Sequence, residues 1–210
     1  DLCVSSMQLD ETDRGFSYAK LAPLDMRMDQ SQGITAQEVI DTYEKPALVH
    51  ILRAYGEEKF ATKIAENLIK NRGHIKNTND LAEIVKSSIP APARRTGGNP
   101  AKRTFQALRI EVNGELKAIE IAIPAALEAL KVGGRLVSLA YQSLEDKIVK
   151  AAFAAVTKSK TPLGLPIDLP NSRAKFQLLT RASEMASAEE IAINSRAQSL
   201  RLRAIERVAA

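Results

Sequence analysis

Two adjacent glycines, Gly133 and Gly134, separate a long helical pattern from a short strand pattern, and this order constrains the fold more than any other feature of the sequence. Apolar residues recur every three or four positions over residues 104–123, which predicts a long amphipathic helix. Residues 135–140 are rich in Leu and Val, which predicts a buried strand, and Ser143 is expected to begin another helix. Helix, glycine turn, strand and helix together form an α/β unit.

Further segments extend this unit. Pro124 is expected either to kink the long helix or to open a following helix over residues 125–130, because proline disrupts helix interiors and favours first turns. Three other stretches have the apolar character of strands, at residues 2–4, 175–180 and 199–208.

Residues 34–92 are expected to form a cluster of short helices. Within them, residues 57–71 carry apolar side chains at four-residue spacing with charged residues on the other face. A second helix is expected to be capped by Thr78 or Asn79 and to stop before Pro90. About 60 residues bury too little surface for strong stability alone, so this section is expected to be stabilised by packing against the rest of the chain.

Two segments are expected to be loops. Residues 1–33 become polar and rich in turn-forming residues after their first few positions, and long loops often carry function. Residues 93–103 contain basic residues and no acidic one. This basic segment is either an ordinary solvated loop or a phosphate contact, and the sequence leaves both readings open.

Charge is distributed unevenly along the chain. Residues 1–58 hold 11 acidic and 5 basic residues, whereas residues 59–210 hold 14 acidic and 25 basic ones, which favours a polyanionic partner for the second part. Aromatic residues make up only 4% and Trp is absent, which disfavours base-stacking RNA modules. The single Cys3 predicts a reducing, cytoplasmic location, and neither a signal peptide nor a membrane-spanning stretch is recognisable.

Most common catalytic and metal-binding patterns are missing from the sequence. The two histidines, His50 and His74, have no Cys or carboxylate at ligand spacing, which argues against a metal site. Ser5 and Ser6 lack the glycines of a nucleophile elbow, and Gly97-Gly98 lacks the Lys of a phosphate loop.

Asp1 is the clearest candidate for a functional group. It adjoins a strand-like piece and precedes a polar loop. Ligands of open α/β sheets bind at the carboxyl ends of strands, so this carboxylate is well placed for a cofactor or a substrate amine.

The chain resembles the bacterial ribosomal RNA small subunit methyltransferase H family, also called MraW, over nearly its whole length. The resemblance is carried, in the family's order, by DLCVSSMQLD (1–10), RGFSY (14–18), PLDMRMD (23–29), YGEEKFATKIA (55–65), RTFQALRIEVNGEL (103–116), GGRL (133–136) and SLEDKIVK (143–150).

The resemblance implies an S-adenosylmethionine-dependent enzyme that methylates the exocyclic N4 of one cytidine in the decoding region of small-subunit rRNA. It implies a Rossmann-like methyltransferase sheet with an inserted all-helical domain. On this basis residues 1–33 belong to the methyltransferase domain, residues 34–103 form the inserted helical domain with the basic segment, and residues 104–210 complete the methyltransferase domain. The partner is small-subunit rRNA or the small ribosomal subunit, no membrane is involved, and a homodimer is compatible with the sequence.

Two residues of this chain, Asp1 and Gln8, match residues that bind the cofactor in the family, and the resemblance implies the same role here. The family's glycine-rich turn and the acid that ends its second strand lie upstream of Asp1. The chain is therefore similar to the C-terminal two-thirds of the enzyme. It is expected to form an incomplete methyltransferase sheet and to be inactive alone. The sequence departs from the family in three places: Cys3 replaces a usual Gly, residues 140–142 (Ala-Tyr-Gln) replace a usual Ser-Phe-His, and residues 194–199 depart from N-P-R-A-R-S.

Methyl transfer to cytidine N4 requires a group that accepts a hydrogen bond from the amine, and the candidates are Asp1, Ser5, Ser6 and Gln142. The candidate RNA-binding residues are Arg27, Arg94, Arg95, Lys102, Arg103 and Arg109. Arg27 either lines the active site or only pairs with Asp25 or Asp29 in its own loop.

Two alternatives stay open at this point. The chain is either part of the enzyme or a non-catalytic RNA-binding protein that kept the fold and lost the cofactor site, as the Gln142 departure favours. If the basic segment is an ordinary loop, the RNA face is expected instead near the C-terminus, at Arg196, Arg201, Arg203 and Arg207.

Overall fold

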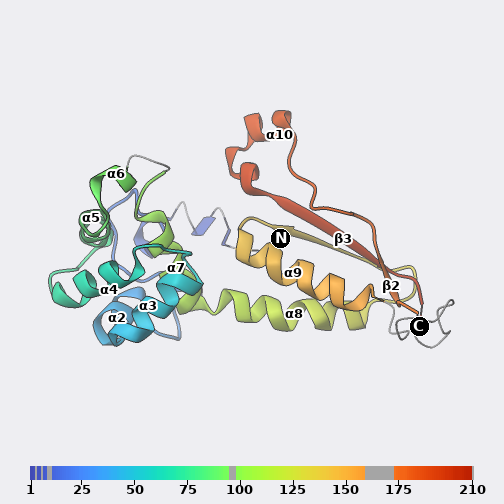
Figure 1. Ribbon diagram of the computed structural model, residues 1–210, viewed down its shortest axis with the longest axis horizontal. Coiled ribbons are helices and arrows are strands. Elements are labelled where there is room, and N and C mark those ends of the chain that lie inside the picture. Colours follow the sequence, from blue (N-terminus) through green and yellow to red (C-terminus); the bar gives the residue numbers. More distant parts are fainter. Residues whose placement is uncertain (3, 6, 9–10, 95–97, 159–172, 210) are drawn as a thin grey trace. The chain divides into compact units, whose positions relative to one another are not determined.

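The computed structural model describes residues 1–2, 4–5, 7–8, 11–94, 98–158 and 173–209 (Figure 1). The chain divides into two compact units. One, the helical unit, is Val4–Glu115, and the other, the sheet unit, combines Asp1–Cys3 with Leu116–Ala210. The predicted three-part division at residues 33 and 103 stays a prediction, because compactness alone does not identify an insertion.

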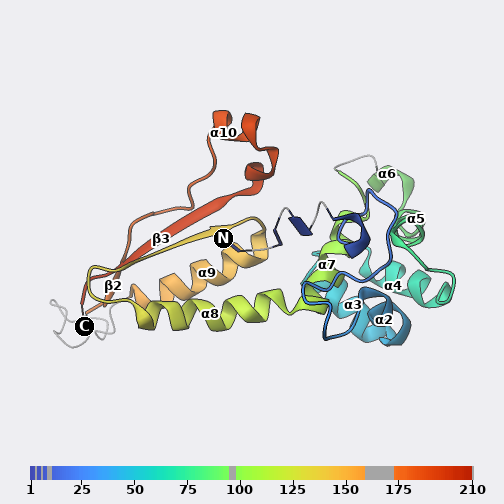
Figure 2. The same ribbon diagram turned by 180° about the vertical axis from the view of Figure 1, so that it is seen from behind.

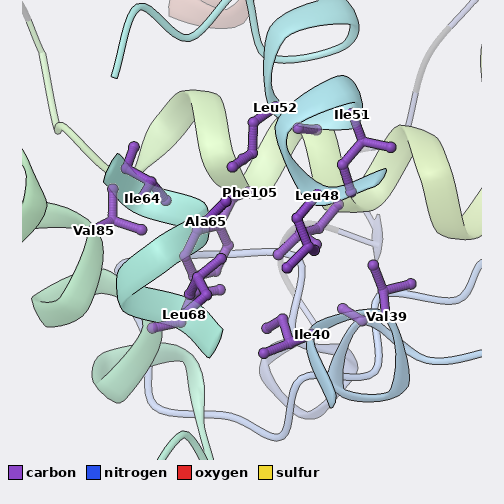
Figure 3. Close-up of a cluster of buried hydrophobic side chains, with 14 of the residues drawn as sticks. Val39, Ile40, Leu48, Ile51, Leu52, Ile64, Ala65, Leu68, Val85 and Phe105 are labelled. Atoms are coloured by element: carbon purple, nitrogen blue, oxygen red, sulfur yellow. The ribbon is translucent and has the colours of Figure 1, made fainter. Parts of the chain in front are cut away.

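The helical unit packs its helices around one apolar core. Its helices are α2 (Ala36–Thr42), α3 (Lys45–Ala54), α4 (Ala61–Lys70), α5 (Thr78–Ser88), α6 (Ala91–Arg94) and α7 (Lys102–Asn113). Figure 3 shows Leu48 and Leu52 of α3, Ile64 and Leu68 of α4, and Phe105 of α7 meeting in this core, where each is nearly or fully buried. Burying a side chain of this size stabilises the fold by about 1.5–3 kcal/mol.

The two helices predicted in this section are present with shifted starts. α4 begins at Ala61 rather than Glu57, because Glu57 has a positive φ of 49° and the buried Glu58 carboxylate accepts a hydrogen bond from the Phe60 N–H. α5 ends before Pro90 as expected. Its predicted cap is wrong, since the Asn77 side chain accepts the N–H groups of the first turn.

The single long helix predicted over residues 104–123 is wrong. The structure has two helices there, α7 and α8 (Glu115–Ala129), separated by Gly114, which ends α7 in the left-handed conformation at φ 60°. Pro124 lies inside α8 and does not end it. It is exposed, and its missing N–H removes one hydrogen bond to the carbonyl four residues earlier.

The sheet unit contains a three-stranded antiparallel sheet of order β1-β3-β2. Its strands are β1 (Arg135–Ala140), β2 (Phe176–Leu178) and β3 (Arg201–Arg207), and its remaining elements are α9 (Ser143–Val156), α10 (Ala188–Ile193) and the short 3-10 helix η3 (Ser195–Ser199). All three strands lie within predicted strand segments, and α9 begins at the predicted Ser143. In both views α8 and α9 run side by side along the strands (Figures 1 and 2).

The prediction that residues 135–140 form a buried strand is wrong for one face of β1. One face of the strand packs on a core formed with Ile123 of α8 and Phe153 of α9, whereas Val137 on the other face is 50% exposed. The cause is that these helices cover one face of the strand. Leu2 donates its N–H to the Leu139 carbonyl at 2.9 Å, so the first residues lie beside β1.

These findings fit the predicted fold class, a mixed α/β methyltransferase sheet with an all-helical part. In the part of the chain that the structure describes, no helix is long and apolar enough to span a membrane. No group of three or more potential metal-binding side chains is found among these residues either.

Candidate functional site

A loop over residues 14–29 of the helical unit has a tightly specified backbone. Gly15 has φ 72°, and a Cβ at this position would meet the Pro23 carbonyl oxygen at 2.1 Å, so only glycine fits. Met26 also has a positive φ, 60°, which is uncommon for a residue with a side chain. The Met26 side chain is fully buried in the helical core, which anchors the loop there.

Two side chains from outside the PLDMRMD segment hold its main chain. Arg14 donates from Nη2 to the carbonyls of Arg27 at 3.0 Å and Met28 at 2.6 Å. Asn113, at the end of α7, donates from Nδ2 to the Met26 carbonyl at 2.8 Å and accepts the Met28 N–H at 2.7 Å. The peptide groups on both sides of Arg27 are therefore fixed.

Arg27 forms a two-point ion pair with Asp25. Its Nε lies 2.8 Å from Oδ1 and its Nη2 lies 2.9 Å from Oδ2 of Asp25. The side chains are only 21% and 18% exposed. The hydrogen bonds from Arg27 hold the pKa of the Asp25 carboxyl below its ordinary value. Of the two partners proposed for Arg27, the structure selects Asp25.

This ion pair predicts a dependence of stability on pH. The pKa of Asp25 is lower in the folded than in the unfolded chain, so its contribution is present above about pH 4, the unfolded value, and is lost as pH falls through the folded pKa. We expect the stability difference between wild type and Asp25→Asn to shrink as pH drops from 7 to 3. Urea unfolding at several pH values measures it, and a constant difference would contradict the assignment.

Ser5 and Gln8 form a reciprocal hydrogen-bonded pair. The Gln8 Oε1 accepts the Ser5 N–H at 3.0 Å, and the Gln8 N–H lies 3.4 Å from Ser5 Oγ. This pattern is a capping box at the start of a helical turn. The hydrogen bond from Ser5 occupies the Oε1 atom of the Gln8 amide. The Nε2 atom of the same amide is the one that can donate a hydrogen bond to a carboxylate. Ser6 lies outside the described residues.

Two predicted site residues adjoin the last part of β1. Asp1 is exposed and adjoins Leu2, which is bonded to the penultimate residue of β1. Gln142 lies two residues after the end of β1 and is the N-cap residue of α9. These two residues belong to the sheet unit, whereas Ser5, Gln8 and Arg27 belong to the helical unit.

The Gln142 amide is oriented by a residue that the sequence reasoning missed, Glu145. Glu145 is fully buried and accepts hydrogen bonds from Gln142 Nε2 at 2.9 Å and the Tyr141 N–H at 3.1 Å. The Gln142 Oε1 is buried and has no hydrogen-bond partner among the described residues. An orphaned acceptor of this kind costs about 1–3 kcal/mol until a donor reaches it. The SLEDKIVK block was the signal that could have pointed to Glu145.

The predicted RNA-binding residues differ in how they are held. Lys102 and Arg103 are exposed on the first turn of α7, and Arg103 donates to the Glu57 carbonyl at 3.0 Å. Arg94 ends α6 and is half-buried, and Arg95 lies outside the described residues. Arg109 forms a two-point ion pair with the buried Glu115, at 2.8 and 3.0 Å, which favours a structural role.

The alternative RNA face near the C-terminus is partly used by the fold. Arg203 pairs with Asp146 at two points, 2.7 and 3.0 Å. Arg207 donates to the Leu130 carbonyl at 2.8 Å and lies over the Phe176 ring. Arg201 contacts Ser183 Oγ at 3.4 Å, and Arg196 is exposed.

The sequence matches known proteins along its length. The profile of the MraW methylase family matches residues 1–208, the whole chain rather than part of it. Proteins named "Ribosomal RNA small subunit methyltransferase H" are 57% identical in Salinispora tropica, covering 99% of this chain and 57% of the relative, and 56% identical in Nocardia farcinica, covering 100% and 65%. The relative in Mycolicibacterium gilvum is 58% identical, covering 99% and 57%.

The chain thus spans between 57% and 65% of the length of these three relatives. The family profile and the level of identity lead to the same assignment: the chain belongs to the MraW methylase family.

Proposed function

We propose that the protein transfers a methyl group from S-adenosylmethionine to the exocyclic N4 of a cytidine in the decoding region of small-subunit rRNA, in the cytoplasm. Members of this family use S-adenosylmethionine. The observation that carries the proposal is the pair of hydrogen-bond acceptors at the carboxyl end of β1, the Asp1 carboxylate and the orphaned Gln142 Oε1. An amine substrate needs acceptors of this kind.

The residues present fit part of such a cofactor. The exposed Asp1 carboxylate of the sheet unit is suited to an ammonium or hydroxyl group. The proposed role of Gln8 rests on the family resemblance alone. When bound, the cofactor supplies an activated methyl group on a sulfonium. Asp1 then accepts a hydrogen bond from the amine and orients its nitrogen, which is the positioning that an in-line transfer requires. Gln142, held by Glu145, offers a second acceptor.

Labelled methyl transfer tests the proposal. The full-length protein is incubated with labelled S-adenosylmethionine and either small-subunit or large-subunit rRNA. Label is expected in the small-subunit RNA alone. A non-catalytic RNA-binding protein is the second candidate, favoured by Gln142 at a position where the family commonly has His, and it would bind the same RNA without transferring label.

The basic segment supplies a further prediction. If Arg94, Arg95, Lys102 and Arg103 contact phosphates, replacing all four by Ala is expected to weaken rRNA binding at low salt. It should also flatten the slope of log affinity against log salt by up to about 3 units, at about 0.7 per single-strand phosphate. Affinity for S-adenosylmethionine should be nearly unchanged.

A second quadruple variant controls for the change in net charge. Lys59, Lys63, Lys70 and Lys76 are all exposed in the same unit and lie outside the basic segment. Replacing these four by Ala is expected to leave the slope close to that of the wild type. Equal slopes in both variants would make the basic segment an ordinary loop and favour the C-terminal arginines.

A further inference from the structure

The exposed side of α9 carries lysines and no acidic side chain. Lys147 and Lys150 are exposed three residues apart, and Lys158 is exposed just beyond the end of the helix. These three residues form the lysine surface of α9. The two acidic residues of the helix, Glu145 and Asp146, are both buried. The exposed charges of this helix therefore all have the same sign.

Contacts within the sheet unit hold both carboxylates on the inner side of α9. Asp146 is bound at two points by Arg203 of β3, at 2.7 and 3.0 Å. Glu145 accepts hydrogen bonds from Gln142 Nε2 at 2.9 Å and from the Tyr141 N–H at 3.1 Å. Neither carboxylate can turn outward without losing these bonds, so the acids of α9 do not pair with its exposed lysines.

The other helices of the sheet unit have different surface charges. On α8 the exposed Lys117 Nζ lies 3.8 Å from Glu120 Oε2, and Glu128 is exposed further along the helix. α10 exposes Glu189 and Glu190. Among the α-helices of this unit that the structure describes, α9 is the one that presents only positive charges to solvent.

Between its lysines, α9 exposes only small side chains. Ala151 and Ala155 lie four and eight residues after Lys147 and are exposed, whereas Val149 and Phe153 are buried in the core. A membrane-bound helix or a protein interface needs large apolar side chains as anchors, and on α9 these side chains face inward. A polyanionic backbone needs only positive charges that it can approach closely.

We propose that the lysine surface of α9 binds phosphate groups of the rRNA backbone, an inference that rests on the proposed function. A lysine ammonium contacts a phosphate as a point charge. Contacts of this kind fix the position of a protein on RNA and carry no sequence information. The lysine surface therefore contributes affinity and orientation, and the choice of the methylated base depends on other groups.

The salt dependence of RNA binding by the full-length protein tests this inference. A small-subunit rRNA fragment is titrated at several salt concentrations with the wild type and with the triple variant Lys147→Ala, Lys150→Ala and Lys158→Ala. The slope of log affinity against log salt is expected to flatten by up to about 2 units, at about 0.7 per single-strand phosphate. Affinities for fragments of different sequence should fall by similar factors.

Two further variants control for folding and for net charge. Replacing the same three lysines by Arg keeps the charges and is expected to keep the wild-type slope. Lys117, Lys131 and Lys175 are exposed in the same unit outside α9, and their replacement by Ala removes the same number of charges. This second triple variant is expected to keep a slope close to that of the wild type.

Two results would overturn the inference. One is a slope in the α9 alanine variant that matches the wild type or changes no more than in the control variant. The other is weaker binding to vesicles of anionic phospholipid with unchanged RNA binding, which would make the lysine surface a membrane contact. If the wild-type protein neither binds nor methylates the RNA, the proposed function itself fails, and that outcome is distinct from both.

Discussion

Replacing Arg203 by Ala is expected to lower the free energy of unfolding by about 3–5 kcal/mol, the range found when one partner of a buried ion pair is removed. Arg203 of β3 and Asp146 of α9 are only 13% and 12% exposed and are joined by hydrogen bonds of 2.7 and 3.0 Å. Without Arg203, the Asp146 carboxylate remains buried without its partner. Urea unfolding followed by circular dichroism measures the loss.

The sheet unit offers a matched control for this prediction. Arg135 pairs with Glu206 at the same 2.7 Å distance, but its side chain is 66% exposed. Arg135→Ala is expected to cost no more than about 1 kcal/mol, as is usual for surface pairs. Equal losses in the two variants would contradict the structural role of the buried pair.

Replacing Asp1 by Ala in the full-length protein is expected to reduce methyl transfer by about 100-fold or more, the range typical of a positioned acid–base or polar group. The reason is that the amine would lose the acceptor that orients it beside β1. Single-turnover rates with rRNA measure the effect. Asp1→Asn keeps an acceptor oxygen and should fall between Ala and wild type.

Asp13 provides the comparison for a simple loss of charge. It is an exposed carboxylate near the start of the chain, in the short helix Thr12–Arg14. Asp13→Ala is expected to keep nearly wild-type activity. Wild-type turnover in Asp1→Ala would remove Asp1 from the site.

Elements with a clear local pattern were predictable from the sequence. The strand Arg135–Ala140 was predicted with its observed bounds, because the flanking Gly133–Gly134 turn and Ser143 mark both ends. The break at Gly114 was missed because the apolar spacing continues across it in both helices. A single glycine inside a periodic pattern is a weak signal until its φ is known.

The contacts that shape the candidate site depend on distant residues. Asn113 lies 85 residues beyond Met28, whose N–H it accepts, and no local pattern connects the two. The Arg27–Asp25 pair was among the predicted alternatives because the residues are two apart. The Gln142 Oε1 atom lacks a partner in an amide that the buried Glu145 orients. The burial of Glu145 could not be predicted from the sequence, because a charged residue near the start of a helix is usually exposed.

The identity of the methylated nucleoside tests the central claim most directly. Small-subunit rRNA that lacks the modification is treated with the full-length protein and S-adenosylmethionine, digested to nucleosides and analysed by mass spectrometry. The account predicts N4-methylcytidine from a single decoding-region position, and its near-complete loss with Asp1→Ala. A different methylated nucleoside, or RNA binding without any methylation, would contradict it.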